Sequence, residues 1–377
     1  MRIAGISALS IKSLMLALAL LAFLPTTPII HDDEVLIPDK LELYANGRIR
    51  YESTFDQTNG EDRHRGRIRF RIGGKYKLDD KLNVHARVST SSDGVDANSP
   101  YLDFGDSGDG FEGAELLLDR FYVEWFTNDW ITLQAGKLPH VFTTPPVSGE
   151  ILWDDDIQPA GFTAKFSCTE ANKKYDLRLL KYTAVESGSD DDPSMVGAQF
   201  NATCDVQDDL SVHFATAITH WSNLNPGSGS FQNQGNVLNG AGDFASDFAV
   251  WDSFIDVTHQ GGPFGRQQGF VMFWDNMKES GQRGYACGAR VGNHQAPGDY
   301  SLFGFWFQAD ADSLFSPVSQ DDLPLAGTGA GSGVQGIGYG SDYRINEDVT
   351  LRLWALGSRS ETTDNPFRVR LDLNFNI

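Results

Sequence analysis

Arginine occurs at every second position in one short stretch of this chain. The stretch contains Arg65, Arg67, Arg69 and Arg71, with Ile68, Phe70 and Ile72 on the alternate positions. A period of two is that of a β-strand, so one face would carry guanidinium groups and the other apolar side chains. Such a strand needs water on one side and apolar surroundings on the other. The wall of a water-filled membrane barrel provides both, although the antiparallel sheet of a soluble protein also alternates apolar and polar residues.

Further arginines fall on the polar faces of neighbouring segments: Arg48, Arg50, Arg87 and Arg120. An arginine facing lipid would cost roughly 2–4 kcal/mol near the membrane midplane, so all of these side chains are expected to face the water inside the barrel. They are therefore candidate pore-lining residues that would form a basic wall. In the alternative interpretation, they pair with interior carboxylates such as Glu42, Glu52 and Glu124 and only stiffen the wall.

The rest of the chain supplies the strands that such a wall requires. Sixteen alternating segments are expected, each about the ~9–11 residues that cross a bilayer as tilted strands. They begin near Leu41, His64, Lys81, Leu116, Asp129, Pro159, Lys174, Met195, Leu210, Phe248, Arg266, Arg283, Asp299, Val334, Val349 and Pro366. Short polar turns such as Asp79-Asp80 alternate with long Gly-, Ser- and Asp-rich connections such as Asp310 to Gly333. The sequence thus predicts an all-β fold: a 16-stranded antiparallel transmembrane β-barrel over residues 41–377, with short periplasmic turns and long extracellular loops.

The end of the chain shows the alternation most clearly. From Phe367 to Ile377, apolar residues occupy every odd position and polar residues every even one. This pattern resembles the C-terminal assembly signal of outer-membrane barrels, which usually ends in Phe. Aromatic residues near strand ends are typical of interfacial girdles, and each of them could equally be a packing residue. They include Tyr76, Trp125, Trp130, Tyr182, Trp221, Trp251, Trp274 and Tyr343.

The N-terminus carries the longest continuously apolar segment. Leu14 to Leu24 is apolar and follows Arg2 and Lys12. This run is shorter than the ~20 residues of a spanning helix, and a basic start before a short apolar run is the pattern of a secretory signal peptide. Residues 1–24 are therefore predicted to be a signal peptide, with the cleavage site left open between several small residues.

Composition and motifs argue against several functions. The 377 residues carry a formal net charge of −21, which argues against a nucleic-acid partner. Cys168, Cys204 and Cys287 form neither a disulfide framework nor a zinc motif, so packing residues or free thiols are expected and no metal or cofactor. The chain contains no nucleophile elbow, zincin motif or Walker loop. An enzyme built on His85 or His213 in the barrel, or a secreted soluble β-protein, is a less favoured alternative.

From Leu118 to Gly161 the chain resembles the putative porin family of Gram-negative bacteria. The resemblance rests on Arg120-Phe121-Tyr122-Val123-Glu124-Trp125, Leu133-Gln134-Ala135-Gly136-Lys137-Leu138-Pro139, Phe142, Leu152-Trp153-Asp154-Asp155-Asp156 and Gly161-Phe162. It implies a homotrimeric barrel in the outer membrane, in contact with lipid, through which small hydrophilic solutes and ions diffuse. It also implies that the third extracellular loop folds inward as a constriction. By strand count that loop is Lys137 to Gln158, with Glu150, Asp154, Asp155 and Asp156 as candidate constriction residues.

Two transport functions remain open at this point. In the first, the acidic third loop faces the basic wall, and the transverse field orients dipolar solutes in a passive diffusion pore. In the second, the arginines form a ladder like that of phosphate-selective porins, and the channel prefers anions. The position of the loop carboxylates distinguishes these two predictions.

Overall fold

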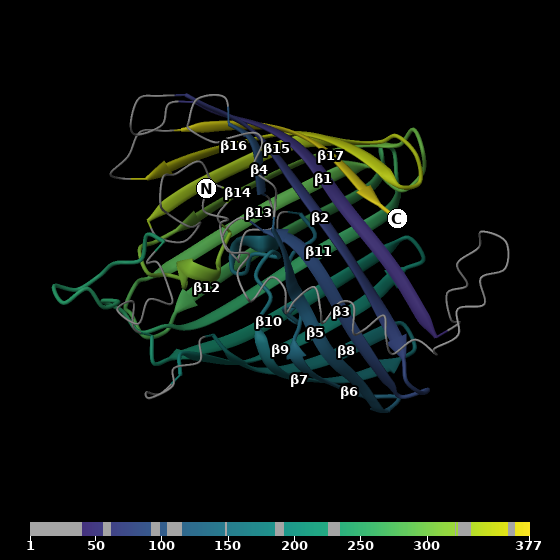
Figure 1. Cartoon of the computed structure of the whole chain (residues 1–377), viewed down its shortest axis with the longest axis horizontal. Helices are drawn as coiled ribbons and strands as arrows, with labels where there is room; N and C mark the ends of the chain where they lie inside the picture. Colours follow the sequence, from purple (N-terminus) through teal and green to yellow (C-terminus); the bar gives the residue numbers. More distant parts are fainter. Residues whose placement is uncertain are drawn as a thin grey trace, which may run out of the picture.

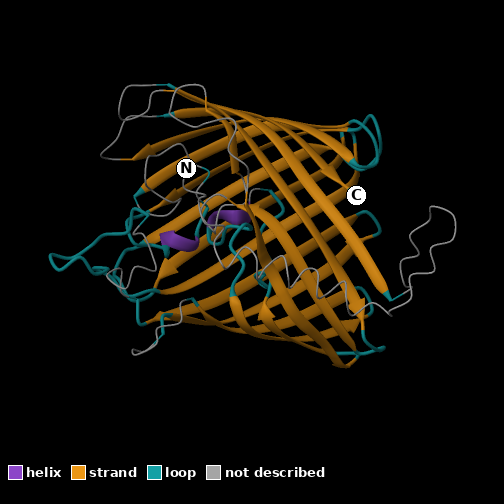
Figure 2. Cartoon of the chain, in the orientation of Figure 1, coloured by secondary structure: helices purple, strands orange, loops and turns teal. Residues whose placement is uncertain are grey.

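The computed structural model describes residues 40–55, 62–91, 99–103, 115–147, 149–184, 192–224, 234–320, 322, 333–360 and 366–377. The predicted signal peptide, residues 1–24, lies outside these described residues. Most of the described chain is β-strand, as Figure 2 shows.

The strands form one closed antiparallel sheet (Figure 1). They are β1 (Leu41–Phe55), β2 (Arg63–Lys77), β3 (Leu82–Ser91), β4 (Ser99–Asp103), β5 (Glu115–Asn128), β6 (Ile131–Lys137), β7 (Ala160–Glu170), β8 (Lys173–Thr183), β9 (Ser194–Gln207), β10 (Leu210–Ser222), β11 (Ala249–Gly262), β12 (Gly265–Asn276), β13 (Arg283–Gly292), β14 (Tyr300–Ala309), β15 (Val334–Arg344), β16 (Val349–Ser360) and β17 (Phe367–Asn376). The barrel closes because β1 pairs with both β2 and β17.

The predicted sixteen-stranded barrel is confirmed, with one interruption in its wall. β3 pairs with β2 from Arg71 to Lys77, and the short β4 pairs with β2 from Arg65 to Ile68. β3 and β4 therefore follow one another along the same edge of β2 and make a single crossing. Counted in this way, the labelled strands give sixteen crossings, and they begin close to the predicted positions.

Connections differ in length between the two ends of the barrel. At one end they are tight, such as residues 208–209 between β9 and β10, and Ile377 lies there because its neighbour Asn376 donates its N–H to the carbonyl of Asp348 in a turn. At the other end run the longest connections, residues 138–159, 223–248 and 310–333, here called loops L3, L5 and L7. In Figure 1 the C-terminus and tight turns lie on the right.

Alternation of side chains gives the wall two chemically different faces. Phe70, Ile72 and Leu371 are exposed on the outer surface, whereas Arg50 and Asp372 are each 1% exposed and point into the barrel. The outer face thus suits lipid, because the charged side chains of these strands are on the inner face.

Only some of the aromatic residues predicted for the interfacial girdle lie on the outer surface. Trp125, Trp130, Trp251 and Tyr343 are exposed, but Tyr182, Trp221 and Trp274 are buried. For these three the girdle interpretation is wrong and the packing alternative holds, because they lie on the inner face and pack beneath the loops that enter the barrel.

The hydrophobic core lies inside the barrel and involves the loops. Val147 and Ile151 of L3, together with Leu314 of L7, pack against inward aromatic side chains such as Phe254 and Phe305. The only helical segments in the described residues are one-turn 3₁₀ helices, among them η1 (Gly149–Ile151) and η3 (Ser316–Val318), drawn purple in Figure 2. Within the described part of the chain, no helix has the length and apolar character needed to cross a membrane.

Candidate functional site

Two glycines mark the point where L3 leaves the wall. Gly136 at the end of β6 and Gly161 at the start of β7 are directly opposite each other, with φ of +128° and +157°. A Cβ on Gly136 would lie 2.4 Å from the carbonyl oxygen of Phe121, and one on Gly161 would lie 2.0 Å from that of Lys181. Only glycine fits this backbone. The motif Gly136-Lys137-Leu138-Pro139 therefore shapes the departure of L3.

The first part of L3 is anchored to the inner face of β9. Gln199 accepts hydrogen bonds from the Thr143 N–H (2.7 Å) and hydroxyl (3.0 Å), and its amide donates to the Thr143 carbonyl (2.9 Å). His140 stacks on Trp153 with ring centroids 4.1 Å apart, and burial lowers the pKa of this histidine to about 3. His140 is therefore a neutral packing group at neutral pH.

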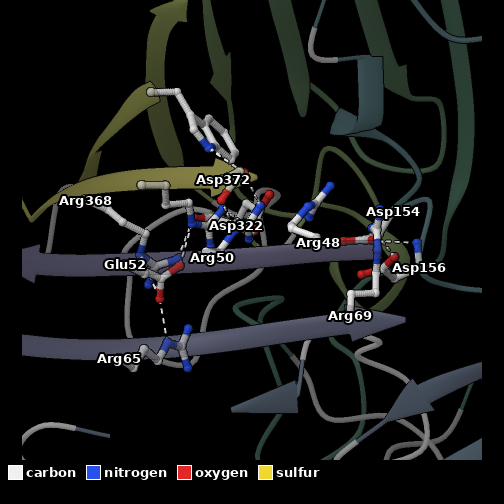
Figure 3. Close-up of polar contacts among 12 residues, drawn as sticks. Arg48, Arg50, Glu52, Arg65, Arg69, Asp154, Asp156, Asp322, Arg368 and Asp372 are labelled. Atoms are coloured by element: carbon white, nitrogen blue, oxygen red, sulfur yellow. Dashed lines mark hydrogen bonds and ion pairs between the residues drawn. The ribbon is translucent and has the colours of Figure 1, made fainter. Parts of the chain in front are cut away.

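The last part of L3 reaches across the barrel to β2. Asp156 forms an ion pair with Arg69 (3.4 Å) and a shorter one with Arg71. Burial acts to raise the pKa of Asp156, but Arg71 and Arg69 hold it below its ordinary value. Arg120 donates to the side chain of Gln158 (2.7 Å). The carboxylate of Asp156 is thus in direct contact with the wall, and Figure 3 shows it beside Arg69.

A cavity of about 360 Å³ lies between L3, L7 and the inner face of the wall. Its charged lining consists of Arg48, Arg50, Arg67, Arg69, Arg71, Arg290, Arg352, Glu150, Asp154, Asp155, Asp156 and Asp322. The aromatic side chains of Phe303, Phe305 and Trp354 form another part of its wall. The arginines come from four strands, β1, β2, β13 and β16, whereas all the carboxylates come from loops.

The register of β1 and β2 concentrates positive charge at this cavity. Arg48 lies directly opposite Arg69, and Arg50 directly opposite Arg67. Like charges at directly opposite positions of an antiparallel pair destabilise the sheet. The neighbouring carboxylates offset part of this repulsion: Asp156 contacts Arg69, and Asp372 contacts Arg50.

Other predicted wall residues have partners away from this cavity. Arg65 pairs with Glu52 (2.6 Å) and Arg87 with Asp119 (2.6 Å), and neither arginine lines the cavity, nor does Arg120. The ion pair of Arg65 with Glu52 agrees with the alternative interpretation, in which arginines pair with interior carboxylates and only stiffen the wall. Two other carboxylates named there have different partners: Glu42 contacts Lys75 and Lys77, and Glu124 contacts His85.

Charged groups on the later strands also line the barrel interior, and the sequence did not predict them. Asp342 lies between Arg290 (2.5 Å) and Arg352 (2.6 Å), and both guanidiniums lie over the ring of Phe303. Arg352 lies between Leu351 and Leu353 and thus follows the same period-two rule as Arg69. The period-two pattern was therefore present in the sequence, but a single arginine in a strand is a weaker signal than four arginines at alternate positions.

Glu150 lies in η1 and lines the same cavity. Burial, followed by the nearby carboxylates of Asp155 and Asp322, raises the pKa of Glu150 to about 8. This side chain is therefore mainly neutral at pH 7. Glu150 therefore contributes little negative charge to the cavity at pH 7, although it is one of the acidic residues that line it.

Cys168, Cys204 and Cys287 are free thiols, as expected from their spacing. Among the described residues, no group of three or more His, Cys, Asp or Glu side chains is arranged to hold a metal ion.

A closed antiparallel barrel with an apolar outer face and a charged, loop-narrowed interior defines an outer-membrane channel protein. The chain belongs to the family described as Putative porin, whose model matches residues 46–248. The protein is an outer-membrane barrel of a Gram-negative bacterium, and its family and fold are those of a channel rather than an enzyme.

Solved porin structures share this fold at low sequence identity. OprB of Pseudomonas putida, determined at high pH, has a TM-score of 0.60 and 11% identity over 90% of this chain and 94% of its own. OmpF of Salmonella typhi, in complex with daunomycin, has a TM-score of 0.56 and 11% identity over 91% of this chain and 99% of its own. A loop L8 deletion mutant of OmpT of Vibrio cholerae has a TM-score of 0.50 and 12% identity over 90% of this chain and 100% of its own. No curated protein sequence matches this chain.

Proposed function

We propose that the barrel is a passive pore for small hydrophilic solutes and ions, narrowed where L3 approaches the arginine wall. The observation that carries this proposal is the cavity of about 360 Å³ with strand arginines on one side and L3 carboxylates on another. Opposed charges in a narrow, water-filled passage orient dipolar solutes and discriminate between ions. In this proposal Arg48, Arg50, Arg67, Arg69 and Arg71 act on permeating solutes, while Arg65 and Arg87 stiffen the wall.

A second candidate, an anion-selective channel, is favoured by the charge at the cavity. Its lining holds seven arginines, Arg48, Arg50, Arg67, Arg69, Arg71, Arg290 and Arg352, against five acidic residues, Glu150, Asp154, Asp155, Asp156 and Asp322. Because the pKa of Glu150 is about 8, one of these acids is mainly neutral at pH 7. A net positive passage would favour anions even though the whole chain has a formal net charge of −21.

The reversal potential of single channels under a salt gradient tests both candidates. Replacing Asp154, Asp155 and Asp156 by Asn removes L3 carboxylates and should shift ion preference toward anions, whereas Arg67→Gln with Arg69→Gln should shift it toward cations. A wild-type preference for cations would exclude the anion-selective candidate. Unchanged reversal potential in both variants would place these residues outside the ion path.

The homotrimer and the removal of residues 1–24 belong to the same proposal and rest on the family resemblance and on the basic-apolar N-terminal pattern. Crosslinking of the detergent-extracted protein should give a trimer band. Mass spectrometry of the mature protein should find a start beyond residue 17, among the small residues of the apolar run or just after it.

A further inference from the structure

L7 enters the barrel as L3 does. Phe315 and Val318 of L7 are buried against Trp221, Phe244 and Phe248. The indole N–H of Trp274, a fully buried side chain of β12, donates to the Ser313 hydroxyl at 3.2 Å. This part of L7 therefore packs on the inner face of the wall.

L5 holds L7 in this position through buried polar groups. The Asn236 amide donates to the Asp312 carboxylate and to the Leu314 carbonyl, both at 3.0 Å, and its oxygen accepts the N–H of Ser316 at 2.8 Å. The Ser246 hydroxyl adds a hydrogen bond to Asp312 at 2.7 Å. Since all these groups are satisfied within the two loops, residues 312–316 of L7 have a defined position inside the barrel.

L7 also contacts L3 directly. The N–H of Asp154 donates to the carbonyl of Val318 at 2.8 Å. The two loops are thus joined at the acidic segment of L3, and each borders the cavity.

Beyond η3, Asp322 projects toward the wall at the seam between β1 and β17. Its carboxylate is 2.6 Å from Arg370 and 3.8 Å from Arg50, and its carbonyl accepts from Arg368 at 2.7 Å. Burial acts to raise the pKa of Asp322, but Arg370 and Arg50 lower it well below its ordinary value, so the group is ionised. In Figure 3 Arg48 lies between Asp322 on one side and Asp154 and Asp156 on the other.

We propose that the described part of L7, residues 310–320 and 322, forms a second constriction and that Asp322 is a determinant of ion selectivity alongside the L3 carboxylates. This inference rests on the proposed function, because it assigns a role within the same passage. It follows that the carboxylates of the passage come from two loops on opposite sides of the barrel, separated by eight strands (β7 to β14), and that selectivity depends on both.

Removal of the Asp322 charge should leave the barrel seam intact. Arg50 keeps its two contacts with Asp372, at 2.7 and 3.0 Å, and Arg370 keeps Glu52 at 2.5 Å. Without the Asp322 carboxylate, one positive charge of the Arg50 and Arg370 pair would be left uncompensated at the passage. One charge at ~5–10 Å in water changes the local concentration of a monovalent ion roughly two- to fourfold.

The test compares Asp322→Asn with Asp247→Asn, a matched removal of an exposed L5 carboxylate that does not line the cavity. Under a KCl gradient, Asp322→Asn should lower the cation-to-anion permeability ratio by about four- to sixteenfold, because the local cation concentration falls and the local anion concentration rises by the factor given above. Asp247→Asn and the charge-retaining Asp322→Glu should resemble wild type. If Asp322→Asn leaves the ratio unchanged while the L3 variants shift it, this inference is overturned alone. Absence of conductance from the wild-type protein would overturn the proposed function and this inference together.

A second experiment makes the change in a barrel that is already folded. Asp322→Cys is prepared in a background where Cys168, Cys204 and Cys287 are replaced by Ser, and the channel is modified in the bilayer. An anionic methanethiosulfonate reagent should move the reversal potential toward cation preference, and a cationic one toward anion preference. Equal currents before and after complete modification, established by mass spectrometry, would place Asp322 outside the passage.

Discussion

Arg50 and Asp372 form a bidentate ion pair across the seam that closes the barrel. They are directly opposite each other on β1 and β17, with the Arg50 Nε 2.7 Å from Oδ1 and Nη2 3.0 Å from Oδ2 of Asp372. Each residue is 1% exposed, and the indole N–H of Trp354 donates a further hydrogen bond to the same carboxylate at 3.0 Å. The first and last strands are thus joined by side chains as well as by backbone.

Asp372→Ala should destabilise the barrel strongly, because it leaves Arg50 without this partner in a buried site. Loss of one partner of a buried pair costs about 3–5 kcal/mol. We expect the folded band on SDS gels to convert to the unfolded band at a markedly lower temperature. Asn374→Ala, on the same strand face, removes only the neutral acceptor of Arg48 and should cost about 0.5–1.5 kcal/mol. Equal losses in the two variants would contradict a special role for the charge pair.

Cysteine substitutions should report the two faces of the wall. In a background without native cysteines, Arg67→Cys, Arg69→Cys and Arg87→Cys should react with a small charged thiol reagent added in water. Ile68→Cys and Phe70→Cys should resist it in lipid, because their side chains are on the opposite face. The reverse pattern would mean a register shifted by one residue, which moves every side chain to the other face.

Ion preference should depend on pH through Glu150. Its carboxyl is neutral below a pKa of about 8 and anionic above it, so the cavity gains a negative charge as the pH rises through this value. The reversal potential should therefore move toward cation preference between pH 6 and pH 9.5 (a window of ~1.5–2 units about the pKa), and Glu150→Gln should abolish that shift. Glu347→Gln, an exposed turn residue, serves as the control. A shift that persists in Glu150→Gln would assign the titration to another group.

The position of L3 should depend on Gln199. Gln199→Ala removes the three hydrogen bonds to Thr143, each worth about 0.5–1.5 kcal/mol, so the loop should fluctuate more in the passage. We expect greater open-channel noise, measured in single-channel records. Gln268→Ala, which removes a side-chain hydrogen bond from β12 to Thr258, is the matched control. Identical noise in the two variants would show that this anchor does not control L3.

The sequence by itself determined the strands and their faces. The period-two pattern at Arg65–Ile72 and at Phe367–Ile377 identified which side chains point inward, because placing arginine against lipid is costly and a strand offers only two faces. The structure has these strands close to the predicted positions, and the sixteen crossings follow from them. The identity of L3 needed the strand count together with the family resemblance.

Only the tertiary structure decided which charges meet and which loops enter the barrel. The Arg50–Asp372 pair joins residues more than 300 positions apart, and the Asp322–Arg370 pair joins L7 to β17. The burial of Tyr182, Trp221 and Trp274 likewise depends on L3, L5 and L7 covering the inner face. A local pattern specifies the face on which a side chain lies. It does not specify what covers that face, because this depends on long-range packing between loops whose own sequences carry no strand-like period.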